Sequence, residues 1–185
     1  MANRFVIANP NYCLGCYTCM AACAFVHKEN GLQPYPRLYI TYTSEGTMPI
    51  QCRHCEDAPC ANVCPVGAIK KEGDAIIIDE KACIGCKTCL LACPFGAIDF
   101  LPQYDFEQET FQCVKEGNNK EVETMEQKIV AVKCDLCYFR EEGPACVQFC
   151  PTKALKLVKE EETRNVIKNK RVTNVERLVS VYEGK

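Results

Sequence analysis

Short strand-like segments separated by turns make up most of the hydrophobic pattern of this 185-residue chain. Two such segments lie at residues 37–43 (RLYITYT) and 128–133 (KIVAVK), and a third follows Pro151 as Ala-Leu-Lys-Leu-Val. Apolar residues on both sides of Glu72-Gly73-Asp74 predict a short hairpin within residues 66–79. No apolar run approaches the roughly 18 residues of a membrane span, so we expect no direct membrane insertion.

The last residues of the chain predict an amphipathic helix. Thr173-Asn-Val-Glu176 fits a capping box and Gly184 is placed to end the helix, which gives it about eleven residues. So short a helix is marginal alone in water. We therefore expect its apolar face to pack on its own subunit or on another chain, including a second copy, where it would drive assembly. The residues of this face recur at helical spacing and are Val175, Leu178, Val179 and Tyr182.

The cysteines add the most information to this pattern. Sixteen of the 17 cysteines fall into four quartets, and the last three quartets are followed by proline (Pro65, Pro94 and Pro151). The first and third quartets have C-x2-C-x2-C-x3-C spacing, while the second widens the middle gap to four residues and the fourth to eight. This spacing is typical of the ligands of bacterial-ferredoxin iron–sulfur sites, and four quartets predict four [4Fe–4S] clusters.

Zinc and disulfides explain the cysteines less well. Structural zinc normally takes paired C-x2-C knuckles, whereas two quartets here place three cysteines within seven residues. Disulfides need an oxidising compartment, and the opening MANRFVIANP lacks the pattern of a secretory signal. We therefore expect iron–sulfur ligation and a cytoplasmic location.

Composition and charge agree with this interpretation. Only 48% of the residues are hydrophobic with cysteine included, and tryptophan is absent, so metal ligation should contribute directly to folding. The formal net charge is −2. Four clusters at about −2 each would bring it to about −10, which argues against nucleic acid as a partner.

The way ferredoxins share their ligands predicts four sites. In two-cluster ferredoxins the first three cysteines of a run bind one cluster and the fourth binds the other. Pro94 ends the short helix that would connect two such clusters, while Gly15 and Gly85 would let their loops approach the cluster sulfurs. The expected ligands are Cys52, Cys55, Cys60 and Cys93 for site 1; Cys83, Cys86, Cys89 and Cys64 for site 2; Cys13, Cys16, Cys19 and Cys150 for site 3; and Cys134, Cys137, Cys146 and Cys23 for site 4.

Internal repeats predict the organisation of the chain. Pro65-Val-Gly-Ala-Ile matches Pro94-Phe-Gly-Ala-Ile, so residues 51–100 form one expected ferredoxin-like module. Residues 1–50 and 128–159 would be the two halves of an outer module, joined by the polar connection 101–127, with a turn at Gly117-Asn118-Asn119, and followed by the tail 160–185. The expected fold class is α+β: two interleaved bacterial-ferredoxin-like (βαββαβ-type) modules, each with two [4Fe–4S] clusters, plus a C-terminal amphipathic helix.

Five further residues, one in the polar connection and four beside the quartets, allow two interpretations. Cys113, the odd cysteine, is either a spare thiol or a substitute ligand or cross-link. His54 and His27 either form ordinary hydrogen bonds or tune a neighbouring cluster. Lys87 and Lys153 either offset cluster charge or are simply solvated.

The cysteine motifs resemble those of a known family, the four-cluster electron-transfer subunits of molybdopterin oxidoreductases. The resemblance covers Arg4 to about Val158 and is greatest to the small cytoplasmic members that link formate dehydrogenase to a hydrogenase. It implies the same cysteine pairing as above and no substrate site on this subunit. Ala24 follows the first quartet in place of proline, which is usual for the family. The stretches that carry the resemblance are RFVIANPNYCLGCYTCMAAC, CRHCEDAPCANVCPVGAI, ACIGCKTCLLACPFGAI and KCDLCYFREEGPACVQFCPTKAL.

The expected function is therefore electron transfer rather than catalysis. The partners that the resemblance implies are a molybdenum- or tungsten-pterin formate dehydrogenase and a hydrogenase or another iron–sulfur subunit. Two alternatives stay open: a free-standing polyferredoxin and an assembly factor for such a complex. Nucleophile motifs, P-loops and dinucleotide fingerprints are absent from the sequence.

Overall fold

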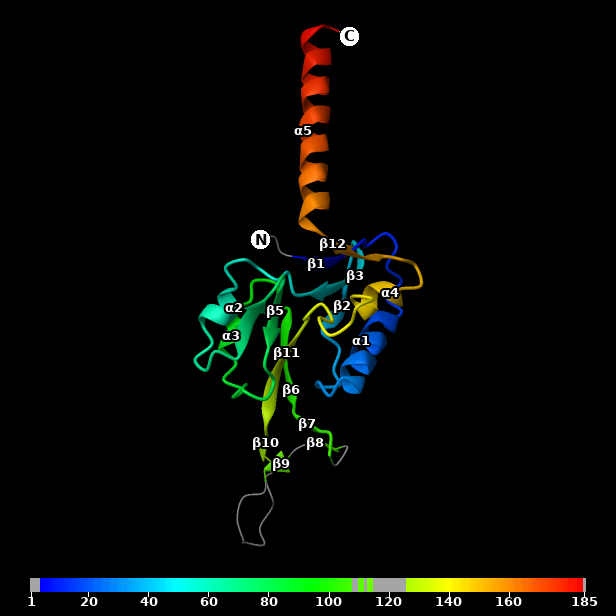
Figure 1. Cartoon of the computed structure of the whole chain (residues 1–185). Helices are drawn as coiled ribbons and strands as arrows, with labels where there is room; N and C mark the ends of the chain where they lie inside the picture. The colour runs from blue at the N-terminus through cyan, green and yellow to red at the C-terminus, as the bar shows by residue number, and fades with distance from the viewer. Residues whose placement is uncertain (1–3, 108–109, 112, 115–125, 185) are drawn as a thin grey trace.

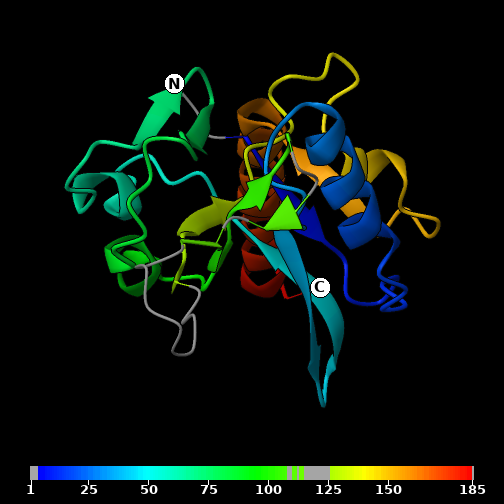
Figure 2. The ribbon, with the colours of Figure 1, turned by 90° about the horizontal axis from the view of Figure 1, so that it is seen from below.

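The computed structural model describes residues 4–107, 110–111, 113–114 and 126–184. The described part mixes helices with short antiparallel strand pairs, as the α+β prediction expected. Two pairs of helices lie on opposite sides of the body, with α2 and α3 on one side and α1 and α4 on the other (Figure 1), and the view from below shows the same separation (Figure 2).

The two ends of the body meet in one strand pair. The strand β1 (Phe5–Ala8) runs antiparallel to β12 (Leu155–Val158), which confirms the predicted strand after Pro151. Between them in the chain come α1 (Thr18–Glu29) and the hairpin of β2 (Leu38–Thr43) and β3 (Gly46–Gln51). The predicted strand at residues 37–43 is thus confirmed, whereas β3 was not predicted, because Gly46 and Pro49 weaken its strand pattern.

The middle of the chain contains the second set of elements. The helix α2 (Pro59–Asn62) precedes the hairpin of β4 (Ile69–Glu72) and β5 (Ala75–Ile78), and this pairing confirms the hairpin prediction. The helix α3 (Thr88–Ala92) leads into β6 (Ile98–Pro102). The strand β6 pairs antiparallel with β11 (Ile129–Lys133), which confirms the strand predicted at residues 128–133.

The polar connection contains only short strands among its described residues. These are β7 (Tyr104–Asp105), β8 (Thr110–Phe111), β9 (Cys113–Val114) and β10 (Glu126–Gln127), paired β7 with β8 and β9 with β10. The predicted turn at Gly117-Asn118-Asn119 and the side chain of Cys113 lie outside the described part of the structure. After β11 the chain enters α4 (Ala145–Gln148).

The core consists of two main clusters that meet at β5. One includes Ile76 together with Val130 and Val132 of β11, and the other includes Ala75 and Ile77 together with Val6 and Leu38. Because successive side chains of a strand point to opposite faces, a single short strand contributes to both cores. The first core also contains Cys60, Cys83 and Cys89, and the second contains Cys19, Cys23 and Cys146.

The tail forms a helix, but the predicted start is wrong. The helix α5 spans Glu160–Tyr182, so Thr173 lies in its interior and the capping-box prediction fails. Its first turn carries three glutamates, which the positive end of the helix dipole stabilises. Gly184 follows the helix with a φ of 69°, as expected for a residue that ends it.

Apart from an ion pair at its base between Glu162 and Lys156 of β12, the helix α5 does not pack on the rest of its own chain. It projects away from the body as an isolated rod (Figure 1), and every described residue from Glu161 onward is exposed. The predicted apolar face is open to solvent, with Leu178 69% and Tyr182 96% exposed. Packing of this face on its own subunit, one of the two expected arrangements, is therefore wrong.

Candidate metal centres

Two cysteine loops share an unusual backbone conformation. In the first loop Gly15 and Tyr17 have φ values of 67° and 60°, and in the third loop the equivalent Gly85 and Lys87 have 69° and 64°. Alternating left-handed residues turn successive backbone N–H groups toward one concave side, a geometry that binds anions and occurs at iron–sulfur sites. Tyr17 and Lys87 also stand at the N-termini of α1 and α3. Both loops therefore have a backbone suited to an anionic cluster.

Gly85 is required by close packing as well as by φ, whereas the group nearest to Gly15 is the end of an exposed tyrosine side chain. A Cβ at Gly85 would lie 2.5 Å from the carbonyl oxygen of Ile129 in β11. A Cβ at Gly15 would lie 2.9 Å from the Tyr42 hydroxyl oxygen. The sequence interpretation attributed both glycines to contact with cluster sulfurs, and the structure adds that a strand or a side chain covers each loop.

Two cavities are each lined by cysteines from two different quartets. In the first cavity the last cysteine of the second quartet joins three from the third, and in the second cavity the last cysteine of the fourth quartet joins three from the first. Each cavity is thus lined by three cysteines of one quartet and by the last cysteine of another quartet. The lining cysteines are Cys64, Cys83, Cys86 and Cys89 in one cavity and Cys13, Cys16, Cys19 and Cys150 in the other.

The other eight cysteines of the quartets also lie in mixed neighbourhoods. Burial raises the pKa of Cys55, and the charges of Cys52 and Cys93 raise it further. Burial likewise raises the pKa of Cys23 to about 12, with Cys137 as the next contribution. Burial also raises the pKa of Cys146, and the charges of Cys23 and Cys137 raise it further. Since electrostatic influence falls with distance, the structure brings Cys93 close to the second quartet and Cys23 close to the fourth.

Burial makes several of the quartet thiols reluctant to ionise. It raises the pKa of Cys19, Cys89 and Cys137 to about 11 each. Cys16 and Cys86 are exposed, and hydrogen bonding to Thr18 and Thr88 lowers their pKa. Because a metal binds thiolates, loading the buried positions must release protons.

Backbone N–H groups already point at several cysteine sulfurs. The N–H of Arg37 donates to Cys23 Sγ at 3.3 Å, and the N–H of His54 donates to Cys52 Sγ at 3.3 Å. The N–H of Ala131 donates to Cys83 Sγ at 3.4 Å. Such hydrogen bonds stabilise negative charge on the sulfur and tune the potential of a bound cluster.

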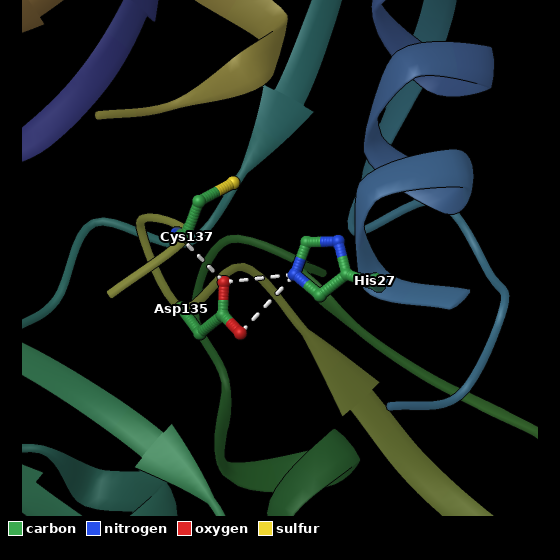
Figure 3. A group of neighbouring side chains, drawn as sticks. All are labelled: His27, Asp135 and Cys137. Carbon is green, nitrogen blue, oxygen red and sulfur yellow. Dashed lines mark hydrogen bonds and ion pairs between the residues drawn. The ribbon is translucent and has the colours of Figure 1, made fainter. Parts of the chain in front are cut away.

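A buried histidine–aspartate pair supports the loop of the fourth quartet (Figure 3). His27 Nε2 lies 3.1 Å from Asp135 Oδ1 and 3.2 Å from Oδ2, while His27 Nδ1 lies 2.5 Å from the carbonyl oxygen of Cys23. Asp135 Oδ1 also accepts the N–H of Cys137 at 2.9 Å. Ligand atoms of His27, Asp135 and Cys137 lie within 4.8 Å of one another.

The surroundings of Asp135 keep its carboxylate ionised. Burial works to raise its pKa, but the hydrogen bond and charge of His27, the charge of Arg37 and the Cys137 N–H together lower it to about 2. Sequence reasoning missed Asp135, although its place between Cys134 and Cys137 is a signal that could have found it. His27 forms hydrogen bonds, and its Nδ1 also lies 3.7 Å from Cys23 Sγ. Its contacts anchor two cysteine segments together.

His54 is also a hydrogen-bonding residue. Its buried ring accepts the N–H of Ile76 at Nδ1 over 2.9 Å. Burial, followed by the charge of Lys133, lowers its pKa to about 3. Lys87 and Lys153, by contrast, are exposed, and their φ values of 64° and 52° show that they serve as turn residues of their loops.

The donor set and its geometry define a class of protein. Clustered thiols, left-handed cysteine loops and N–H groups aimed at sulfur fit iron–sulfur clusters and match the expected ligand chemistry. A family model described as 4Fe-4S dicluster domain matches residues 44–116. The protein is therefore of the [4Fe–4S] class.

Similar proteins extend this assignment to nearly the whole chain. Hydrogenase-4 component A of Escherichia coli (strain K12) is 47% identical over 183 residues, covering 91% of this chain and 88% of that protein. Formate hydrogenlyase subunit 2 of the same strain is 44% identical over 179 residues, with the same two coverages. Electron transport protein HydN is 39% identical over 176 residues, covering 91% of this chain and 95% of that protein. The chain belongs to the family of iron–sulfur electron-transfer proteins that includes these relatives, as the motifs predicted.

Proposed function

We propose that this protein is a non-catalytic electron-transfer subunit that carries four [4Fe–4S] clusters and relays single electrons between a pterin-containing formate dehydrogenase and a hydrogenase in a cytoplasmic complex. The names of the relatives support these partners, since they include a formate hydrogenlyase subunit and a hydrogenase component. The observation that carries the proposal is the pair of cavities in which three cysteines of one quartet meet the fourth of another. When bound, each cluster would accept one electron from its neighbour and pass it on.

The ligand sets we propose are sites 1 to 4 as predicted from the quartets. The cavity lined by Cys64, Cys83, Cys86 and Cys89 supports site 2, and the cavity lined by Cys13, Cys16, Cys19 and Cys150 supports site 3. The effect of Cys52 and Cys93 on the pKa of Cys55 supports site 1, and the effect of Cys23 and Cys137 on the pKa of Cys146 supports site 4. The two cores that meet at β5 and the pairing of β1 with β12 support two interleaved modules.

The four sites would form a line in the order 2, 1, 4, 3. Sites 1 and 2 share cysteines of one core, and sites 3 and 4 share cysteines of the other. Beyond the effect of burial, the charge of Cys52 raises the pKa of Cys134, which supports sites 1 and 4 as neighbours across the junction. The exposed cysteines Cys86 and Cys16 belong to sites 2 and 3, the two ends of this line.

Exposed apolar residues beside both ends support docking of redox partners there. Ile84 lies between Cys83 and Cys86 and is 59% exposed, and Leu14 holds the equivalent place in the first quartet and is 74% exposed. A partner covering such residues would exclude water next to the terminal cluster. Two equivalent ends fit a subunit placed between two enzymes better than a protein with one docking site.

The helix α5 would attach the subunit to another chain of the complex. Its apolar residues Val175, Leu178, Val179 and Tyr182 are open to solvent, and an isolated helix needs such a face covered. Lys168, Lys170, Arg171 and Arg177 make its middle basic. Two copies side by side would bring these like charges together, so we favour a different subunit with an apolar groove and an acidic rim.

Among the described residues no helix is long and apolar enough to cross a membrane.

Anaerobic purification of the native protein tests this function. The expected result is about sixteen iron and about sixteen acid-labile sulfide per chain, together with a stoichiometric formate dehydrogenase and a hydrogenase. About eight iron would remove one pair of sites. A fully loaded protein that purifies alone as a monomer would favour a diffusible polyferredoxin, and transient association with an immature complex would favour an assembly factor.

A further inference from the structure

Lys133 is a buried cation at the junction between the two cores. It is the last residue of β11, and only 1% of its surface is exposed. Lysine is almost never fully buried unless its charge is paired. Its placement therefore calls for a compensating negative charge nearby.

The direct partners of Lys133 are neutral carbonyl groups. Its Nζ donates to the carbonyl oxygen of Cys134 at 2.8 Å and also to the carbonyl oxygen of Ile76. Within the part of the chain that the structure describes, no carboxylate forms an ion pair with it. Since an ammonium has three donors, two carbonyls leave one N–H available.

Arg37 provides an instructive contrast. It is also buried, but its guanidinium donates to Glu80 at 2.7 Å, so its charge is balanced within the protein. The exposed Lys87 and Lys153 need no balance, because water solvates them. Lys133 differs from all three in being a buried cation whose hydrogen-bond partners, the carbonyls of Ile76 and Cys134, carry no charge.

Proposed ligands of sites 1 and 4 are neighbours of Lys133. Cys134 follows it in the chain. Lys133 also acts on two cysteines of site 1. Burial raises the pKa of Cys60, and the charge of Lys133 is the largest effect that lowers this pKa. The charge of Lys133 lowers the pKa of Cys55 as well, against the effect of burial. The contact with Ile76 of β5 places the ammonium where the two cores meet.

We propose that Lys133 acts on the clusters electrostatically. Its fixed positive charge favours reduction at the two central sites, 1 and 4. This inference rests on the ligand sets of the proposed function. Adding one electron to a cluster adds one unit of negative charge, and a buried cation nearby stabilises that charge more than it would in water. The central part of the relay would therefore hold an electron more readily than the same sites without the lysine.

Redox titration of the full-length protein, followed by electron paramagnetic resonance, tests this role. Lys133→Met removes the charge at similar side-chain length, and Lys133→Arg retains it. Lys71→Met, which removes an exposed lysine of β4, is the matched control. We expect Lys133→Met to keep the iron content of the wild type and to lower the midpoint potentials of two of the clusters. The expected effect is a tenfold or larger weakening of reduction, about 59 mV for a one-electron couple. Lys133→Arg should restore most of the difference, and Lys71→Met should leave those two potentials unchanged.

Other outcomes would overturn the inference. Unchanged potentials in a fully loaded Lys133→Met protein would show that the charge does not act on the clusters. Loss of iron in both Lys133→Met and Lys133→Gln would assign the lysine to folding instead. A wild-type protein without about sixteen iron would refute the ligand sets themselves, independently of any result with Lys133.

Discussion

Replacing Gly85 tests whether the cysteine loop of site 2 is held against β11. Gly85 has a φ of 69°, and a Cβ there would lie 2.5 Å from the carbonyl oxygen of Ile129. Gly96 is a matched control, since its φ is 59° but its Cβ would meet nothing within 4 Å. Alanine in a left-handed conformation costs about 1–2 kcal/mol at either position. Only Gly85→Ala adds overpacking, which costs about 1–3 kcal/mol more.

The excess cost should appear as faster loss of clusters. Because every 1.4 kcal/mol corresponds to a factor of ten, the additional overpacking predicts a roughly 5- to 150-fold difference between the two variants. The assay is the anaerobic rate of bleaching of the visible absorbance in guanidinium chloride, with the iron content of each purified variant measured first. Gly85→Ala should contain as much iron as Gly96→Ala or less. Equal bleaching rates for Gly85→Ala and Gly96→Ala would refute the argument from the Ile129 carbonyl.

Three further predictions concern ligands, assembly and folding. Cys64→Ser should disturb the cluster held by Cys83, Cys86 and Cys89, and Cys93→Ser should disturb the cluster held by Cys52, Cys55 and Cys60. Electron paramagnetic resonance compares the cluster signals of the two variants. Identical spectra would contradict the crossed ligand sets. Truncation after Lys159 should lower the mass of the native complex while iron per chain stays constant, because every described residue of α5 from Glu161 onward is exposed on its own chain. An unchanged mass would exclude the tail from assembly. Leu178→Asp should weaken assembly, whereas Val166→Asp, outside the predicted apolar face, should not. Removal of iron by a chelator should abolish most of the antiparallel strand structure, because metal ligation contributes to folding. Circular dichroism measures this loss. A native-like spectrum of the iron-free chain would count against the contribution of ligation.

Local spacing alone determined the chemistry of this protein. The patterns that predicted correctly depend on residues close together in the chain: the quartets, the hairpin around Gly73 and the three strands. Such local patterns do not depend on which distant segments pack together. The class of cofactor followed from the same spacing, because a thiolate loop has few other uses at this interval. Where a local motif matched by chance, the prediction failed: Thr173 resembles a helix N-cap, yet the helix continues through it from Glu160.

Tertiary structure decided the residues that act at long range. His27 meets Asp135 across 108 residues of sequence, and Gly85 is covered by the carbonyl of Ile129. Lys133 reads in sequence as the polar end of a strand, and only folding shows that it is buried between two cores. The physical reason is that burial and pairing of charges depend on which distant segments share a boundary, whereas ligand spacing depends on the geometry of a single loop.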